Sequence, residues 1–182
     1  MKLAVFCGSS PGRVEDYARS AERLGSLLAS QGIGLVYGAG STGLMGILAD
    51  AVLRGGGEVI GVTPKMFMNQ GVIHEQLTCL QVVEDMHARK AAIAGMVDGF
   101  IALPGGLGTF EEIFEMLAWG QLGIHQKPCA LLNVNGYYDR FAGVVEFAIQ
   151  EGFINATHRG LLWVESDEEQ LVKRFMGNCA AS

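Results

Sequence analysis

Short apolar runs alternate with amphipathic stretches along the whole of this 182-residue chain. The runs predict buried strands, and the longer stretches between them have the three-to-four-residue spacing of helices. Because such alternation favours parallel strands covered by helices on both faces, we expect a doubly wound α/β sheet in a single domain spanning residues 1–182. The expected strands are residues 3–7, 34–37, 58–62, 79–83, 99–103, 129–132 and 161–164. The expected helices are residues 14–30, 44–54, 86–96, 110–122, 138–150 and 168–175.

The composition supports a sheet that is buried on both faces. Hydrophobic residues make up 49% of the chain and charged residues only 18%, more apolar surface than one core of this size needs. We therefore also expect an apolar subunit interface and a homodimer. The net charge of −6, without a basic tract, argues against a nucleic-acid partner. An anionic ligand must then be held by local donors.

The cysteines and histidines indicate neither a disulfide framework nor a metal site. Cys7, Cys79, Cys129 and Cys179 are far apart, without a C-x-x-C pair, and we expect reduced core residues in a cytoplasmic protein. The four histidines lack the spacing of a zinc motif, so no metal is expected. No segment approaches the roughly 20 apolar residues that cross a bilayer, which predicts no membrane contact.

Three glycine-rich segments follow expected strands, at residues 8–12, 38–46 and 104–109. Ligands of open parallel sheets bind beyond the carboxyl ends of the strands, so these segments should meet at one edge. We expect substrate contacts from Gly8, Ser9, Gly40 and Ser41 in the first two segments. The irregular stretch at residues 64–77 is a candidate mobile flap over the same edge.

The third segment has the features of a phosphate-binding turn. Gly105, Gly106 and Gly108 can adopt positive φ and let a ligand approach the backbone, and Thr109 adds a hydroxyl donor. The free N–H groups at the start of the next helix favour an anion. Two carboxylates, at residues 111 and 112, should lie in the first turn of that helix, which suggests chemistry beside the phosphate. A plain strand-to-helix turn is the alternative.

Two further patterns narrow the ligand class. Residues 38–43 match the dinucleotide fingerprint G-x-G-x-x-G, but they follow the second strand, and the next strand does not end on an acidic residue. A mononucleotide therefore suits these glycines better than a nicotinamide cofactor. We also expect substrate contacts from Met86 and Lys90, at residues 86–90. In the same segment Arg89 can fork onto phosphate or ribose oxygens, while Lys90 can act as a point charge. A solvated helix face is the alternative for this pair.

These motifs together resemble one family. Residues 104–112, Pro-Gly-Gly-Leu-Gly-Thr-Phe-Glu-Glu, resemble the P-G-G-x-G-T-x-x-E signature of the "lonely guy" proteins. Those proteins are cytokinin riboside 5′-monophosphate phosphoribohydrolases, long mislabelled as lysine decarboxylases. Residues 6–10, 43–46, 86–90 and 119–125 are also similar, so the resemblance covers essentially the whole chain. Ala39 departs from it, because the family commonly has glycine there.

The resemblance implies a Rossmann-like homodimer that needs no cofactor and hydrolyses the N-glycosidic bond of nucleoside 5′-monophosphates. It implies that Arg89 and Glu112 are catalytic and that the phosphate is held by Gly105, Gly106, Gly108 and Thr109. The preferred base, adenine or an N6-modified cytokinin, stays open. We expect the helix dipole to keep Glu112 ionised, as an electrostatic stabiliser or a base for water. The group that protonates the leaving base is not visible in the sequence.

Two alternatives belong to other functional classes. A lysine decarboxylase would need a lysine that forms a Schiff base with pyridoxal phosphate, and no supporting residues surround Lys90. A non-catalytic carrier of a phosphorylated cofactor, like the molybdenum cofactor carriers, would use the same glycine turn. Such a carrier would not need both Arg89 and Glu112.

Overall fold

A computed structural model describes residues 1–180 and contains one seven-stranded sheet whose strands all run parallel. The strand order is β4-β3-β2-β1-β5-β6-β7. The chain adds β2, β3 and β4 on one side of β1 and then β5, β6 and β7 on the other side, so the expected doubly wound sheet is confirmed. The strands are β1 (Lys2–Phe6), β2 (Gly34–Tyr37), β3 (Val59–Pro64), β4 (Cys79–Val83), β5 (Gly99–Ala102), β6 (Cys129–Leu132) and β7 (Leu162–Glu165).

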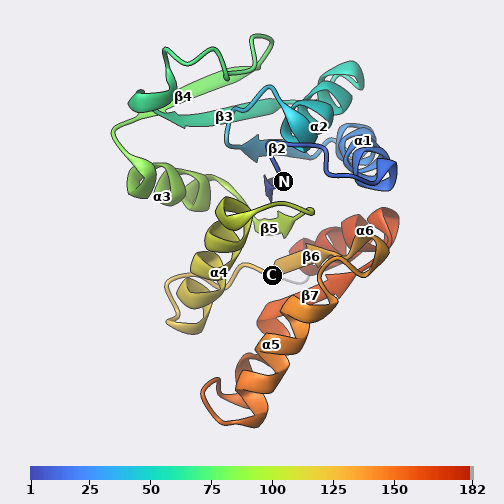
Figure 1. Cartoon of the computed structure of the whole chain (residues 1–182), viewed down its shortest axis with the longest axis vertical. Coiled ribbons are helices and arrows are strands. Elements are labelled where there is room, and N and C mark those ends of the chain that lie inside the picture. The colour runs from blue at the N-terminus through green and yellow to red at the C-terminus, as the bar shows by residue number, and fades with distance from the viewer. Residues whose placement is uncertain (181–182) are drawn as a thin grey trace.

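Helices cover both faces of the sheet (Figure 1). Buried side chains of α1, α2 and α6 form one core cluster with one strand face, and those of α3 and α4 form a second cluster on the other face, joined by the start of α5. The helices are α1 (Glu15–Ser30), α2 (Gly43–Arg54), α3 (Met86–Met96), α4 (Leu107–Gln121), α5 (Asp139–Gln150) and α6 (Glu168–Ala180). Short 3₁₀ helices occur at η1 (Lys65–Phe67), η2 (Val134–Gly136) and η3 (Ala156–Leu161).

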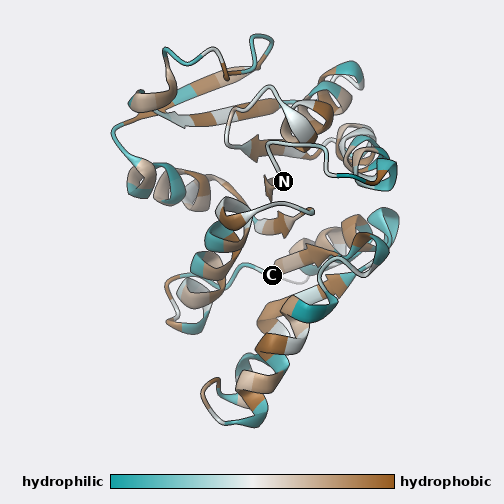
Figure 2. Cartoon of the chain, in the orientation of Figure 1, coloured by the Kyte–Doolittle hydropathy of each residue, from teal (hydrophilic) through white to brown (hydrophobic). Residues whose placement is uncertain are grey.

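The two core clusters follow from the alternation of side chains along each strand. In β1, Leu3 and Val5 pack toward α1 and α2, whereas Ala4 and Phe6 pack toward α3 and α4. All four are at most 3% exposed, and Figure 2 shows the hydrophobic colour of the strands. A strand that is buried on both faces must be apolar throughout, which explains the continuous runs in the sequence.

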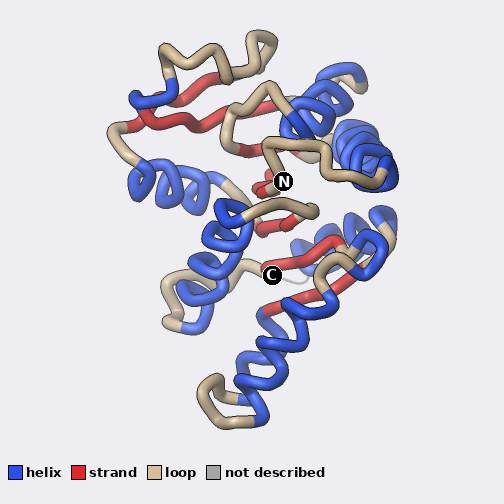
Figure 3. The backbone as a smooth tube through the Cα atoms, viewed as in Figure 1, coloured by secondary structure: helices blue, strands red, loops and turns tan. Residues whose placement is uncertain are grey.

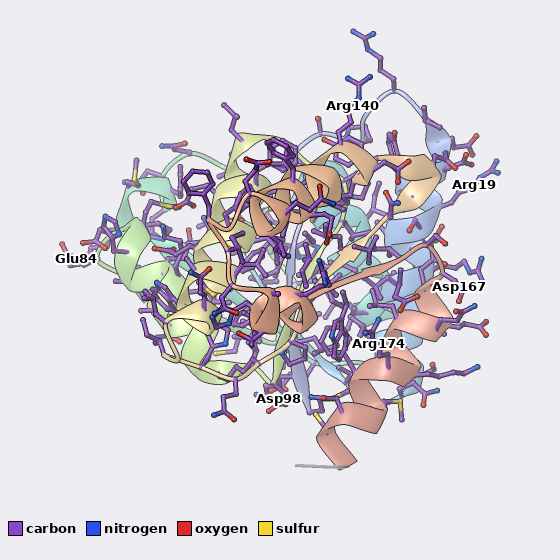
Figure 4. The ribbon with its side chains drawn as sticks, turned by 90° about the horizontal axis from the view of Figure 1, so that it is seen from below. Arg19, Glu84, Asp98, Arg140, Asp167 and Arg174 are labelled. Atoms are coloured by element: carbon purple, nitrogen blue, oxygen red, sulfur yellow. The ribbon has the colours of Figure 1, made fainter. Side chains whose placement is uncertain are left out.

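Most charged side chains are at least partly exposed, whereas Lys90, Glu112 and Glu168 are buried. In Figure 4, the labelled residues Arg19, Glu84 and Arg140 lie at the periphery of the molecule. None of the helices within residues 1–180 has the length and hydropathy to cross a membrane. The cysteine expectation is partly wrong: Cys7 and Cys129 are buried, but Cys79 and Cys179 are exposed. Cys79 is exposed because β4 is an edge strand.

The stretch at residues 64–77 is less independent than the expected flap. Ser41 donates its backbone N–H to the Val72 carbonyl (2.8 Å), and His74 donates to the Ala39 carbonyl (2.9 Å). Gly40 and Ile73 form an antiparallel bridge between these two hydrogen bonds. The part of this stretch after η1, drawn in tan in Figure 3, is therefore tied by backbone contacts to the loop after β2.

Candidate functional site

The glycine-rich turns after β1 and β5 meet at the carboxyl edge of the sheet, beside α3 and the start of α4. They surround a cavity of about 400 Å³, here called the Arg–Glu cavity. Its floor is the end of β1 and its walls come from α2, α3, α4 and η1. It is lined by Cys7, Gly8, Ser9, Met45, Phe67, Met86, Arg89, Gly106, Leu107, Gly108, Thr109, Glu111 and Glu112.

Two smaller cavities adjoin this one at the same edge. The β2-loop cavity, of about 290 Å³, lies between residues 38–42 and the loop residues Phe67, Gln70, Val72 and Ile73. The tyrosine cavity, of about 280 Å³, lies between the β1 and β5 turns and is walled by Tyr17 and Tyr137. Ser9 lines all three cavities, so the three glycine segments do converge.

Arg89 projects from the first turns of α3 into the Arg–Glu cavity. Asp85 caps that helix by accepting a hydrogen bond from the Ala88 N–H (2.8 Å), which fixes where the helix begins. Gly38, at the end of β2, makes room for the guanidinium, because a Cβ at that position would lie 1.9 Å from Arg89 Nη2. The buried Nε of Arg89 has no hydrogen-bond partner within residues 1–180, so an acceptor on a ligand would satisfy it.

Glu112 faces Arg89 across the same cavity, with Oε1 3.3 Å from Nη2. The residue is only 8% exposed. Burial raises the pKa of Glu112 to about 7; Arg89 opposes this shift and Glu111 adds to it. Both protonation states are therefore populated near neutral pH, which is the range where a carboxyl can exchange protons during catalysis.

Glu112 is thus only partly ionised near neutral pH, rather than kept ionised as expected, and the reason is the start of α4. The helix begins at Leu107 rather than at residue 110, so residues 111 and 112 lie in its second turn. The helix dipole acts mainly on the first turn, and burial dominates beyond it. Gly108 and Thr109, expected in the turn, instead belong to the first turn of the helix.

The start of α4 leaves its backbone donors open to a ligand. Gly106 is the N-cap residue, and no side chain within the described residues caps this end. Gly106, Leu107, Gly108 and Thr109 all line the cavity. Uncapped N–H groups and the positive end of the helix dipole together favour an anion such as a phosphate.

Gly105 is required here for space rather than for positive φ, whereas a Cβ at Gly106 or Gly108 would meet no atom within 4 Å. The expectation of positive φ at Gly105, Gly106 and Gly108 is wrong, because none of these three has it. Gly105 is needed because a Cβ would lie 2.1 Å from the Thr109 hydroxyl oxygen and 2.8 Å from the Gly8 nitrogen. Positive φ occurs instead at Gly43 (61°) and at Ala39 (63°), where alanine is strained.

Two predicted binding residues point elsewhere. The Lys90 ammonium is paired with Glu111 and lies 2.7 Å from a Glu115 oxygen, and it lines none of the three cavities. Ser41 also lines none of them, since its hydroxyl donates to the Val72 carbonyl (3.1 Å). We therefore correct both expectations: Lys90 belongs to an ion cluster between α3 and α4, and Ser41 anchors the loop at residues 64–77.

The other predicted residues are at or next to the site. The Arg–Glu cavity brings together Gly8, Ser9, Met86, Arg89, Gly106, Gly108, Thr109 and Glu112. Gly40 lines the β2-loop cavity, and Gly105 lines the tyrosine cavity. Met45, Phe67 and Tyr137 also line these cavities, although the sequence motifs did not place them among the expected site residues. Met45 lies within the Gly-Leu-Met-Gly stretch at residues 43–46, a signal that was available, whereas Phe67 lies in the irregular loop and carries no motif.

The fold defines a Rossmann-like α/β protein, and the open helix end beside a buried arginine is a site of the kind that binds anionic ligands. Residues 45–175 match the family model described as possible lysine decarboxylase. Cytokinin riboside 5′-monophosphate phosphoribohydrolase LOG1 of Arabidopsis thaliana is 47% identical over 96% of this chain and 82% of its own length. The same enzyme of Oryza sativa, LOG, is 47% identical over 96% of this chain and 72% of its own. The chain belongs to this LOG family.

Solved structures with the same fold include proteins that are named for a different function. The molybdenum cofactor carrier protein of Chlamydomonas reinhardtii is 23% identical, with a TM-score of 0.72 over 97% of this chain and 98% of that one. The molybdenum cofactor binding protein of Rippkaea orientalis is 20% identical, also with a TM-score of 0.72, over 98% and 95% of the two chains. At this identity the likeness establishes the architecture alone.

Proposed function

We propose that this protein hydrolyses the N-glycosidic bond of a nucleoside 5′-monophosphate, such as AMP or a cytokinin riboside 5′-monophosphate. The products are the free base and ribose 5-phosphate. The observation that carries this proposal is the buried Arg89–Glu112 pair, which lies in one cavity with the uncapped start of α4. Its relatives at 45–48% identity are named for this activity, which adds independent support.

The phosphate is placed at the start of α4, against the backbone of Gly106 and Gly108 and beside Thr109. Arg89 then reaches the phosphate or the ribose with its free Nε and its guanidinium fork. Holding the phosphate fixes the distant C1′ carbon near Glu112, so binding energy from the non-reacting end orients the reacting centre. No cofactor is needed for such a hydrolysis.

Glu112 is the residue that acts at the bond to be broken. Cleavage of a ribosyl C–N bond passes through an oxocarbenium-like state, which a nearby carboxylate stabilises. In the ionised form Glu112 also accepts a proton from the attacking water, and the water oxygen bonds to C1′ as the base leaves with the bonding electrons. The protonated Glu112 then returns the proton to the departing base, which the pKa of about 7 permits.

The proposal is tested by incubating the purified protein with nucleoside 5′-monophosphates and measuring the free base released. We expect adenine from AMP, or the N6-substituted base from a cytokinin riboside 5′-monophosphate, and little release from the matching nucleosides. Comparable kcat/KM values for adenosine and AMP would mean that the phosphate is not recognised. Absence of base release from every monophosphate, together with tight binding of a phosphorylated cofactor, would leave the carrier function instead. The named carriers are only 20–23% identical to this chain, so the hydrolase is preferred.

We also propose a homodimer formed through α4, α5 and η3. A shallow cavity of about 130 Å³ lies between these elements, and Figure 2 shows hydrophobic residues along α5. An apolar surface of this kind on a soluble domain is typical of a protein interface. Its exposed apolar side chains are Phe114, Leu122, Ile124, Val144, Phe147 and Phe153.

Light scattering at micromolar concentration tests the dimer, and a mass near the 19.4 kDa of one chain would contradict it. Phe147→Asp, at a residue that is 61% exposed, should shift the mass toward one chain without unfolding the protein. Arg140→Asp is the matched control, because this exposed residue of α5 lies outside the apolar set. The cytoplasmic location stays a prediction.

A further inference from the structure

Two adjacent tyrosines reach the phosphate-binding turn from the segment after β6. Tyr137 donates its hydroxyl proton to the Gly105 carbonyl, and Tyr138 donates to the Leu103 carbonyl (2.6 Å). The carbonyl between them, of Pro104, accepts a hydrogen bond from the Gly8 N–H (3.1 Å). Three successive carbonyls at residues 103–105 are therefore each held by a donor from outside the turn.

The position of the tyrosines is itself built by local structure. Asn135 and Gly136 both have positive φ (52° and 72°), which reverses the chain after β6. Asn135 also donates its side-chain amide to Asp16 (2.8 Å), which ties the reversal to α1. The Tyr137 ring then packs edge-on against Tyr17, with centroids 5.7 Å apart. The chain reversal and the contact with Tyr17 therefore hold the Tyr137 side chain in place, so that its hydroxyl has a fixed position.

Holding the Gly105 carbonyl has a consequence for the next N–H group. In a trans peptide the carbonyl of one residue and the N–H of the next point in opposite directions. Tyr137 holds the Gly105 carbonyl on the side of the tyrosine cavity. The Gly106 N–H of the same peptide is therefore aimed away from Tyr137, and Gly106 also lines the Arg–Glu cavity.

We propose that Tyr137 is a positioning residue: through the Gly105 carbonyl, its hydroxyl aims the Gly106 N–H at the 5′-phosphate. This inference rests on the proposed function and assigns a task to a residue that does not line the Arg–Glu cavity. Tyr138 has a different task, because the peptide after Leu103 ends on the nitrogen of Pro104, which has no proton to aim. The Tyr138 hydroxyl satisfies a buried carbonyl and supports the fold.

The two tyrosines supply a matched pair of variants. Tyr137→Phe keeps the ring and its contacts but removes the hydroxyl. We expect KM for AMP and Kd for ribose 5-phosphate each to rise about tenfold, while kcat changes less than about threefold. Tyr138→Phe should lower the melting temperature, because a buried carbonyl loses its donor, and should leave KM and Kd near wild type.

Ribose 5-phosphate binding, measured by calorimetry, separates failure of this inference from failure of the proposed function. Wild-type Kd and KM in Tyr137→Phe would overturn the positioning task. Equal losses of stability and of phosphate affinity in both variants would also overturn it, because Tyr137 would then act only on the fold. If wild-type protein binds ribose 5-phosphate but releases no base from any monophosphate, the hydrolase proposal fails, and the Kd comparison between the variants still decides the task of Tyr137.

Discussion

Helices α3 and α4 are joined by two ion clusters whose members are neighbours in the sequence. Arg89 pairs with Glu112, and the adjacent Lys90 pairs with Glu111 and Glu115. Successive residues of a helix point about 100° apart, so one cluster faces the Arg–Glu cavity and the other lies between the helices. Similar charges one residue apart thus have different surroundings.

The two clusters also differ in how well their charges are satisfied. Burial disfavours the charged Lys90, but hydrogen bonds and charge from Glu111 and Glu115 outweigh it and raise the pKa of its ammonium. Within residues 1–180, Glu112 has one cation at ion-pair distance, Arg89 at 3.3 Å, and burial raises its pKa despite that contact and the weaker effect of the Lys90 charge. In the Lys90 cluster, one ammonium paired with two carboxylates joins the helices, although the buried Glu115 Oε2 makes no hydrogen bond beyond that ion pair. In the Arg89 cluster, the buried carboxyl and the unpartnered arginine Nε line a cavity where a ligand can reach them.

The largest expected effect is at the arginine of the cavity cluster. Arg89→Ala removes the fork that reaches phosphate or ribose and leaves Glu112 buried without its cation. We expect kcat/KM for AMP to fall roughly 10³-fold, with both KM and kcat affected. Steady-state kinetics check this. If Arg89→Ala keeps the wild-type kcat/KM, Arg89 does not act on the substrate, and the two clusters do not differ in function.

The next largest effect is on turnover, at the two glutamates. Glu112→Gln should fold and still bind AMP but lose roughly 10²-fold or more in kcat, because its side chain cannot take up a proton. Glu111→Gln should change kcat less than about threefold, since its carboxylate pairs with Lys90 and is 54% exposed. If Glu111→Gln is inactive while Glu112→Gln is near wild type, the assignment of the carboxylates is reversed.

The comparison also marks the limit of prediction from sequence. Alternating apolar runs and glycines at strand ends predicted the sheet, its helices and the edge where the loops meet, because side-chain periodicity and backbone freedom are local properties. The start of α4 could not be predicted in this way. Gly106 and Gly108 favour a loop, yet the helix begins between them at Leu107. Both the second-turn place of Glu112 and its burial depend on that shift.

The separation of Arg89 from Lys90 was also beyond local reasoning. Both are long cations at the start of one helix, and either can bind a phosphate, Arg89 through its fork and Lys90 as a point charge. Only the packing of α3 on α4 decides which side chain meets Glu111 and Glu115 and which enters the cavity above Gly38. Tertiary contacts, which no single segment encodes, therefore separate the surroundings of these two cations.

A smaller, graded effect should appear with pH. Because the proposed base must be ionised and the pKa of Glu112 is about 7, kcat at saturating AMP should fall about tenfold per pH unit below 7 and level off above it. The bound phosphate adds negative charge nearby, which raises the pKa of Glu112 and shifts this fall in kcat to higher pH. Glu111→Gln should keep the shape of the profile but shift it toward lower pH, because the Glu111 charge contributes to the raised pKa of Glu112. Activity that falls as the pH rises through 7 would instead make the protonated carboxyl the active form.

The smallest effect on catalysis is expected at Lys90, where stability responds instead. Lys90→Met keeps the length of the side chain but leaves Glu115, which is 24% exposed, without its cation. Removing one partner of a fully buried pair costs about 3–5 kcal/mol, and solvent reaching both glutamates reduces this here, so we expect the free energy of unfolding to fall by about 2 kcal/mol. Urea denaturation at pH 7 measures the loss, and kcat/KM for AMP should stay within about threefold of wild type.

The stability that this cluster adds is present while Lys90 is charged and is lost only as the pH rises through its raised pKa, so the difference should be constant between about pH 6 and 9. If Lys90→Met keeps its stability but its KM for AMP rises tenfold or more, Lys90 binds the phosphate. The two clusters would then not differ in function.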